Sequence, residues 1–190
     1  MTKTIQLSLA LALALTAACK KGDDKGGGAA GGAAKTADKP AAAPVWKKVA
    51  SMNIEVEVAP DADVQDNTAS SGFPSSTIYS TDGTPTTFIF GAKDPADSMA
   101  ISKDYESTKA RVQKEHSGFK AFSKDEKAAD GVGFELRYAG TDMIEKDKTL
   151  YGVTIRSKVG DLILDCSTNA SSEAEIEKTA KLCKSIRAAK

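Results

Sequence analysis

The sequence has few of the side chains on which enzyme chemistry most often depends. It contains a single histidine, His116, a single tryptophan and three cysteines, and aromatic residues make up only 6% of the chain. A lone histidine at the end of a predicted helix supplies neither a zinc site of several imidazoles nor a nucleophile–base pair. The sequence therefore predicts no catalytic, cofactor-binding or metal-binding residue, and no cofactor.

Calcium ligands are also incomplete. Asp61 and Asp63 have the spacing that opens an EF-hand loop, but the fifth position is Gln65, the sixth is Asp66 and the twelfth is Gly72. That loop requires oxygen ligands at positions 1, 3 and 5, glycine at 6 and glutamate at 12. The pattern favours a turn with solvated carboxylates, and a looser calcium site is the alternative.

No excess of positive charge is present. The whole chain has 26 Lys and Arg against 26 Asp and Glu, and residues 46–190 have 20 against 23. A mildly acidic domain gives no electrostatic reason to expect a nucleic-acid partner.

Long apolar runs are absent except at the N-terminus. Lys3 is followed by the mainly apolar run 5–15 and then by small residues at 16–18. The run is shorter than the roughly 20 residues that a membrane-spanning helix needs. A basic, then apolar, then small order is typical of a secretory signal peptide, which we assign to residues 1–18.

The end of this segment, Leu15-Thr16-Ala17-Ala18-Cys19, resembles the lipobox of bacterial lipoproteins. The family usually has leucine three positions before the cysteine, where this chain has Thr16, so cleavage by an ordinary signal peptidase is the alternative. The resemblance implies that Cys19 is the first mature residue and carries the lipid. The chain would then be exported and held at the bacterial cell envelope through a lipid anchor.

Residues 19–45 follow as a Gly-, Ala- and Lys-rich segment without a large apolar side chain between Cys19 and Val45. Such a segment cannot bury enough surface to offset the entropy of ordering its backbone. The composition predicts a disordered tether between the lipidated cysteine and one domain at 46–190.

Within that domain, alternating apolar and polar residues predict strands, and apolar residues at spacings of three and four predict helices. An Asp82-Gly83 pair marks a hairpin turn, and Ser172 with Glu175 forms a capping box. Residues 64–76 are interpreted as irregular. The predicted strands are 45–49, 52–58, 77–80, 86–90, 120–123, 132–138, 150–156 and 161–167, and the predicted helices are 98–116 and 172–186.

Hairpins dominate this order, which predicts the α+β class: an antiparallel sheet of about six to eight strands with two packed helices. The outline resembles the PsbP-like fold at 52–58, 88–90, 132–138, 151–166 and 176–186. That resemblance implies a non-enzymatic accessory or binding protein.

Two cysteines, Cys166 and Cys183, remain after Cys19 is assigned to the lipid. Each lies on the apolar face of its predicted strand or helix, which predicts a structural disulfide, with two buried free thiols as the alternative. A helix running straight back along the strand would place Cys183 opposite residue 162. The bond therefore requires a steep crossing, or a connection over 167–171 that reaches outward.

Two classes of function remain open from the sequence. The first is a surface-tethered, non-catalytic module that binds a protein, polymer or small ligand. The second is an exported hydrolase whose site is assembled from scattered carboxylates and hydroxyls. A concave pocket with converging titratable groups would favour the enzyme, and an exposed apolar patch would favour the binding module.

Overall fold

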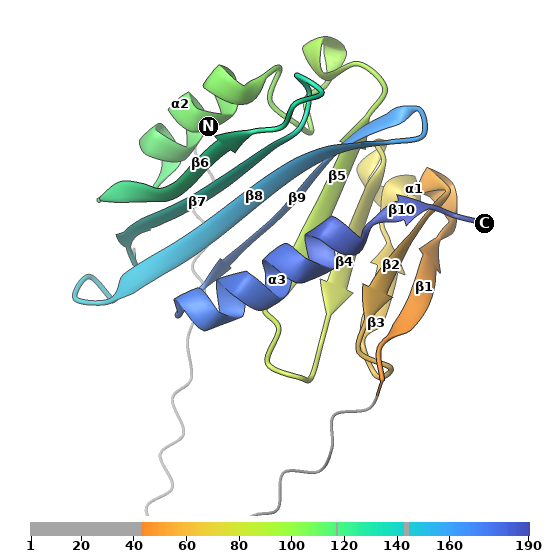
Figure 1. The fold of residues 1–190 in the computed structure, drawn as a ribbon, viewed down its shortest axis with the longest axis horizontal. Coiled ribbons are helices and arrows are strands. Elements are labelled where there is room, and N and C mark those ends of the chain that lie inside the picture. The colour runs from red at the N-terminus through yellow and green to blue at the C-terminus, as the bar shows by residue number, and fades with distance from the viewer. Residues whose placement is uncertain (1–42, 117, 143–144) are drawn as a thin grey trace, which may run out of the picture. The chain divides into compact units, whose positions relative to one another are not determined.

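The computed structural model describes residues 43–116, 118–142 and 145–190. The predicted signal peptide, Cys19 and nearly all of the predicted tether lie outside these residues. The described chain is α+β, with an antiparallel sheet of seven strands in the order β3-β4-β5-β9-β8-β7-β6 and a second sheet of three strands, β1-β2-β10 (Figure 1). No helix in these ranges is both long and apolar enough to cross a membrane.

The elements follow one another along the chain with short connections. The strands are β1 Val45–Val49, β2 Ile54–Val58, β3 Asp63–Asp66, β4 Ser75–Tyr79, β5 Thr87–Ala92, β6 Ala121–Lys127, β7 Phe134–Thr141, β8 Thr149–Val159, β9 Leu162–Ala170 and β10 Arg187–Ala188. The helices are α1 Thr68–Ser71, α2 Tyr105–Glu115 and α3 Glu173–Ser185.

One face of the large sheet carries the main hydrophobic core. Helix α3 lies across this face, and the small sheet lies beside the helix (Figure 1). We call it the α3 face. Its central residues include Ile89, Val153 and Leu164, each fully or almost fully buried. The small sheet adds Ile54 and Val56, which are also fully buried, so both sheets and α3 share one core.

The opposite face of the large sheet is covered by α2 over only part of its width. The Tyr105 ring packs edge-on against Phe134, with 5.6 Å between the ring centroids. The His116 and Tyr138 rings also pack together, with 4.6 Å between their centroids. Phe134 and Tyr138 belong to β7, whose alternate residue Glu135 points instead toward Lys184 of α3. Helix α2 therefore lies over β6 and β7 on what we call the α2 face.

The structure differs from the sequence prediction in several details. Helix α2 begins at Tyr105 rather than near residue 98, because the Asp104 side chain accepts a hydrogen bond from the Ser107 amide and caps the helix there. The segment 64–76, predicted as irregular, contains most of β3, all of α1 and the start of β4. Strand β10 was not predicted, since its two residues pair with β2 across most of the chain.

Gly152 on β8 lies directly opposite Tyr138 on β7. A Cβ atom built on Gly152 would lie 2.2 Å from two carbons of the Tyr138 ring. The ring cannot easily swing away, because His116 packs against it and its hydroxyl lies 3.3 Å from Asn169 Oδ1. Position 152 therefore requires glycine, because the Tyr138 ring fills the space that a Cβ atom would need.

Gly152→Ala should lower the free energy of unfolding by about 2 kcal/mol, the usual cost of overfilling a packed site. Chemical denaturation measures this loss. Gly140→Ala on β7 is the matched control, since its Cβ would meet its nearest neighbour at an ordinary 3.6 Å. The same Gly152 substitution in a Tyr138→Leu background should cost much less; an equal cost in both backgrounds would contradict the explanation.

Candidate functional site: an exposed aromatic surface

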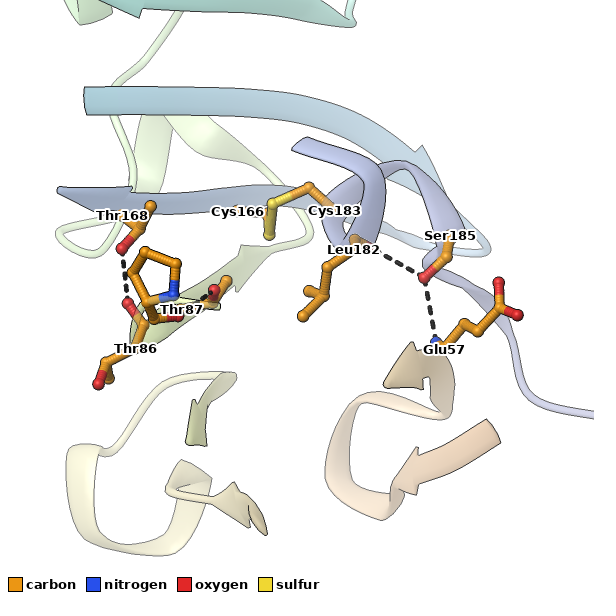
Figure 2. The surroundings of a disulfide bond; sticks show 9 residues. Glu57, Thr86, Thr87, Cys166, Thr168, Leu182, Cys183 and Ser185 are labelled. Carbon is orange, nitrogen blue, oxygen red and sulfur yellow. Dashed lines mark hydrogen bonds between the residues drawn. A yellow bond between two sulfur atoms is a disulfide. The ribbon is translucent and has the colours of Figure 1, made fainter. Parts of the chain in front are cut away.

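The structure joins Cys166 of β9 to Cys183 of α3 in a disulfide, with 5.6 Å between the two Cα atoms (Figure 2). Both residues are 2% exposed, so the bond lies inside the core rather than in a reactive position. The sequence had predicted this pairing. A buried disulfide is typical of proteins that fold in an oxidising, exported compartment.

The length of β9 explains how the two cysteines meet. The strand continues to Ala170 instead of ending at 167, so α3 starts farther out. The distance along the strand from Ala170 back to Cys166 is about 13 Å, at the usual rise per residue of a strand. The distance along the helix from Glu173 to Cys183 is about 15 Å, at the usual rise per residue of a helix. The two distances nearly match, and this extension supplies the outward reach that the sequence analysis required.

Replacing both Cys166 and Cys183 with serine should lower the free energy of unfolding by about 2–4 kcal/mol, the usual contribution of a disulfide that closes a short loop. Thermal or denaturant unfolding measures the loss. The unfolded, unreduced wild-type domain should show no free thiol from these two residues. Two titratable thiols in that state would contradict the bond.

The α3 face carries a cluster of charges around Glu135. Its carboxylate accepts from Arg137 at 2.7 Å, Lys184 at 2.8 Å and Lys124 at 3.0 Å. Burial raises the pKa of Glu135, but the hydrogen bonds from these cations outweigh it and lower the pKa from 4.5 to about 2. A carboxylate held so firmly in its charged form is a poor general base near neutral pH.

The Glu135 cluster makes the free energy of unfolding depend on pH. Since the unfolded chain binds this proton near pH 4.5 and the folded chain only near pH 2, the free energy of unfolding falls as the pH drops through that window. The cluster is partly open to solvent, so we expect a loss of about 1–2 kcal/mol. Glu135→Gln should remove this part of the pH dependence in denaturation between pH 6 and about pH 2.5. Glu126→Gln, at the exposed edge, should retain it.

A hollow of about 440 Å³ lies beside the start of α2. Several of its charged side chains already have partners within the domain: Lys127 pairs with Glu106 at 3.0 Å, and Arg156 donates two hydrogen bonds to Asp165 at 2.6 and 2.8 Å. Arg156 also donates to the carbonyl of Ser102 at 2.7 Å. Arg156 therefore holds the loop and the sheet together.

Hydroxyl groups gather at a carboxylate around Asp66, as they do at several other acidic residues of the domain. Ser51 donates to Asp66 through its amide at 2.9 Å and its hydroxyl at 2.6 Å, and the Thr68 amide donates at 3.2 Å. Burial raises the pKa of Asp66, and these hydrogen bonds outweigh it and lower the pKa. The arrangement secures the start of α1 and leaves the carboxylate a weak base.

The predicted calcium alternative finds no support in the positions of its residues. Asp61 accepts a hydrogen bond from Thr81, and Asp63 accepts one from Gln65 at 2.7 Å. Asp66 accepts the hydrogen bonds from Ser51 and Thr68 described above. Within the described ranges, no group of three or more histidine, cysteine or acidic residues is placed to hold a metal ion. His116 is packed on Tyr138, and burial lowers its pKa.

The part of the α2 face that α2 leaves open carries a row of aromatic side chains. Phe73, Phe88 and Phe90 are successive neighbours, with ring centroids 6.1 Å apart for Phe73 and Phe90 and 6.4 Å for Phe88 and Phe90. Phe88 is 40% exposed, and Tyr79 on the adjacent strand β4 is 45% exposed. We call Phe73, Tyr79, Phe88 and Phe90 the aromatic surface.

Uncharged polar groups border the aromatic surface. The register places Phe88 between Thr77 of β4 and Ser167 of β9, and Asn169 follows on the same face of β9. Phe90 lies beside Asp165, whose charge Arg156 neutralises. The centre of the surface therefore has large apolar rings, hydroxyls and an amide, but no unpaired charge.

This surface was not predicted from the sequence. Phe88 and Phe90 were assigned to a strand, and their alternation with Ile89 places both phenylalanines on one face. Ile89 is fully buried on the α3 face, which puts both phenylalanines on the other side. What the pattern does not reveal is that α2 covers β6 and β7 and stops short of β5.

A scan against protein-family models and a comparison with curated protein sequences both found no match to this chain.

Proposed function

We propose that this protein is an exported lipoprotein whose domain is a non-catalytic binding module, and that the aromatic surface is its contact site. The observation that carries the proposal is the exposure of Tyr79 and Phe88 on an uncovered sheet face. Water-soluble domains rarely leave neighbouring large aromatic side chains in solvent unless a partner covers them. Aromatic residues are also the most frequent anchors of protein interfaces.

The chemistry of the surface defines the kind of partner. Without an unpaired charge among its central residues, the surface offers nothing specific to phosphate, nucleic acid or a metal ion. Aromatic rings bordered by Ser167 and Asn169 fit the apolar, uncharged surface of another protein, whose polar groups the serine hydroxyl and the asparagine amide can satisfy. We infer a protein partner of this chemistry.

The proposed lipid anchor gives this module its place. The match of Ala17-Ala18-Cys19 to the lipobox and the composition of 20–44 favour a domain that is held at a membrane and reaches its partner through a flexible tether. The buried disulfide supports an exported location.

An exported hydrolase remains the second candidate from the sequence, but its requirements fit the described residues less well. The Asp66 cluster brings hydroxyls to a carboxylate, but its hydrogen bonds weaken that base. Glu135 is bound by three cations. The binding module accounts for the exposed aromatics, which the hydrolase leaves unexplained.

Lipidation should occur at Cys19. In cells supplied with an alkyne-labelled palmitate, the wild-type chain should take up label and Cys19→Ser should not. Intact mass of the membrane-extracted protein should give a mature chain that begins at Cys19 and carries acyl groups. A mature chain with another first residue and no acyl mass would contradict the lipobox assignment.

A photoreactive benzophenone amino acid at position 79 should cross-link the exported full chain to a protein in intact cells. Phe88→Lys should abolish the product, because it places an unpaired charge in the centre of the interface. Position 46 is the matched control, since Trp46 is as exposed as Phe88 but lies on the small sheet; it should give no such product. The absence of any product from position 79 would overturn the proposed site.

A further inference from the structure

We propose that the protein which covers the aromatic surface is a second copy of this chain, so that two domains pack face to face about a two-fold axis. This inference rests on the proposed binding function and names its partner. It is drawn from four properties of the chain: the composition of the tether, the charge of the surface, the edges of the large sheet and the anchoring in a membrane.

The segment that precedes the domain is a poor occupant. Between Cys19 and Val45 it contains no large apolar side chain, only Gly, Ala, Lys, Asp, Thr and Pro. Such a sequence offers no side chain to pack against Phe88 or Tyr79, and its lysines would lose hydration there. A surface built from large rings requires a partner with large apolar groups.

The charges of the aromatic surface do not oppose contact with a second copy of itself. In a two-fold dimer the same patch lies on both sides, so an unpaired charge at its centre would face a like charge. Here the neighbours of Phe88 are Thr77 and Ser167, and the nearest acidic group in the register, Asp165, is bound by Arg156. The charged residue beside Tyr79 is Asp63, on the outermost strand β3, at the edge of the surface.

The edges of the large sheet are closed to a second copy. Strand β6 ends in the charged run 124–127 and has an irregular register between Phe122 and Lys124. Strand β3 is only four residues long and begins and ends with aspartate. Short, charged or irregular edge strands oppose extension of a sheet from one molecule to the next. Association is thus directed to the open face, where two sheets can stack about 10 Å apart.

A membrane anchor makes even a small surface of this kind sufficient. Two domains held on the same membrane meet at a much higher effective concentration than in free solution, so a few aromatic contacts can hold them without a large buried area. The apolar rings of Phe88 and Phe90 supply the centre of such a contact, and Ser167 and Asn169 supply a polar rim.

The experiment uses two copies of the exported full chain, each with a different epitope tag, expressed in one cell with the benzophenone at position 79 of one copy. The expected product contains both tags and has twice the mass of the chain. Phe88→Lys in both copies should abolish this product, and so should Phe88→Glu in both. Phe88→Lys in one copy with Phe88→Glu in the other should restore it, because opposite charges then meet across the axis.

Three other outcomes are possible, and each contradicts the second-copy inference, the proposed binding site or both. A product made only with a different protein overturns the second-copy inference and leaves the proposed binding site in place. No product of any kind overturns both. A two-tag product that persists in the Lys–Lys pair shows that the copies meet through another surface. Circular dichroism of each variant should match the wild type, and the restored Lys–Glu pair excludes misfolding as the reason for the losses.

Discussion

Helix α3 links the two sheets, because it packs on β8 and β9 of the large sheet and on β2 of the small sheet. Its start is fixed by Ser172, which forms a capping box with Glu175. Its third turn is bonded to β9 through Cys183, and its last turn accepts the Glu57 amide of β2 on the Ser185 hydroxyl at 3.0 Å (Figure 2). Helix α3 therefore helps to hold the small sheet against the large one.

The two faces of the large sheet use their polar groups differently. On the α3 face the charged cluster around Glu135 lies at the margin of the core and remains partly hydrated. On the α2 face the Arg156–Asp165 pair is nearly removed from water, with side chains 2% and 4% exposed, and the guanidinium also lies over the Phe134 ring. Buried pairs of this kind add little net stability, but breaking one leaves an uncompensated charge. The pair thus favours the position of the 93–104 loop in which the carbonyls of Ser102 and Lys103 accept hydrogen bonds from Arg156.

Local patterns were sufficient to predict most of this fold. Alternation located β2 and β7, a turn at 158–160 located the hairpin of β8 and β9, and the capping residues located α3, since each of these signals acts over a few residues. The prediction failed where distant segments decide the structure. Arg187 and Ala188 become a strand only because β2 lies beside them, and Val64 in β3 depends on β4. The aromatic surface was missed for the same reason: exposure of Phe88 depends on where α2 ends, and no residue near Phe88 encodes that.

The small sheet has a consequence for the order in which the chain can complete its fold. Synthesis proceeds from the N-terminus, so β2 is made before both its partner β10 and helix α3, which covers Ile54 and Val56. Until then the apolar side of β2 has no cover, whereas Cys166 and Cys183 are separated by only 17 positions and can meet as soon as both have emerged. Completion of the small sheet thus waits for α3 and β10, although β1 and β2 are made long before them.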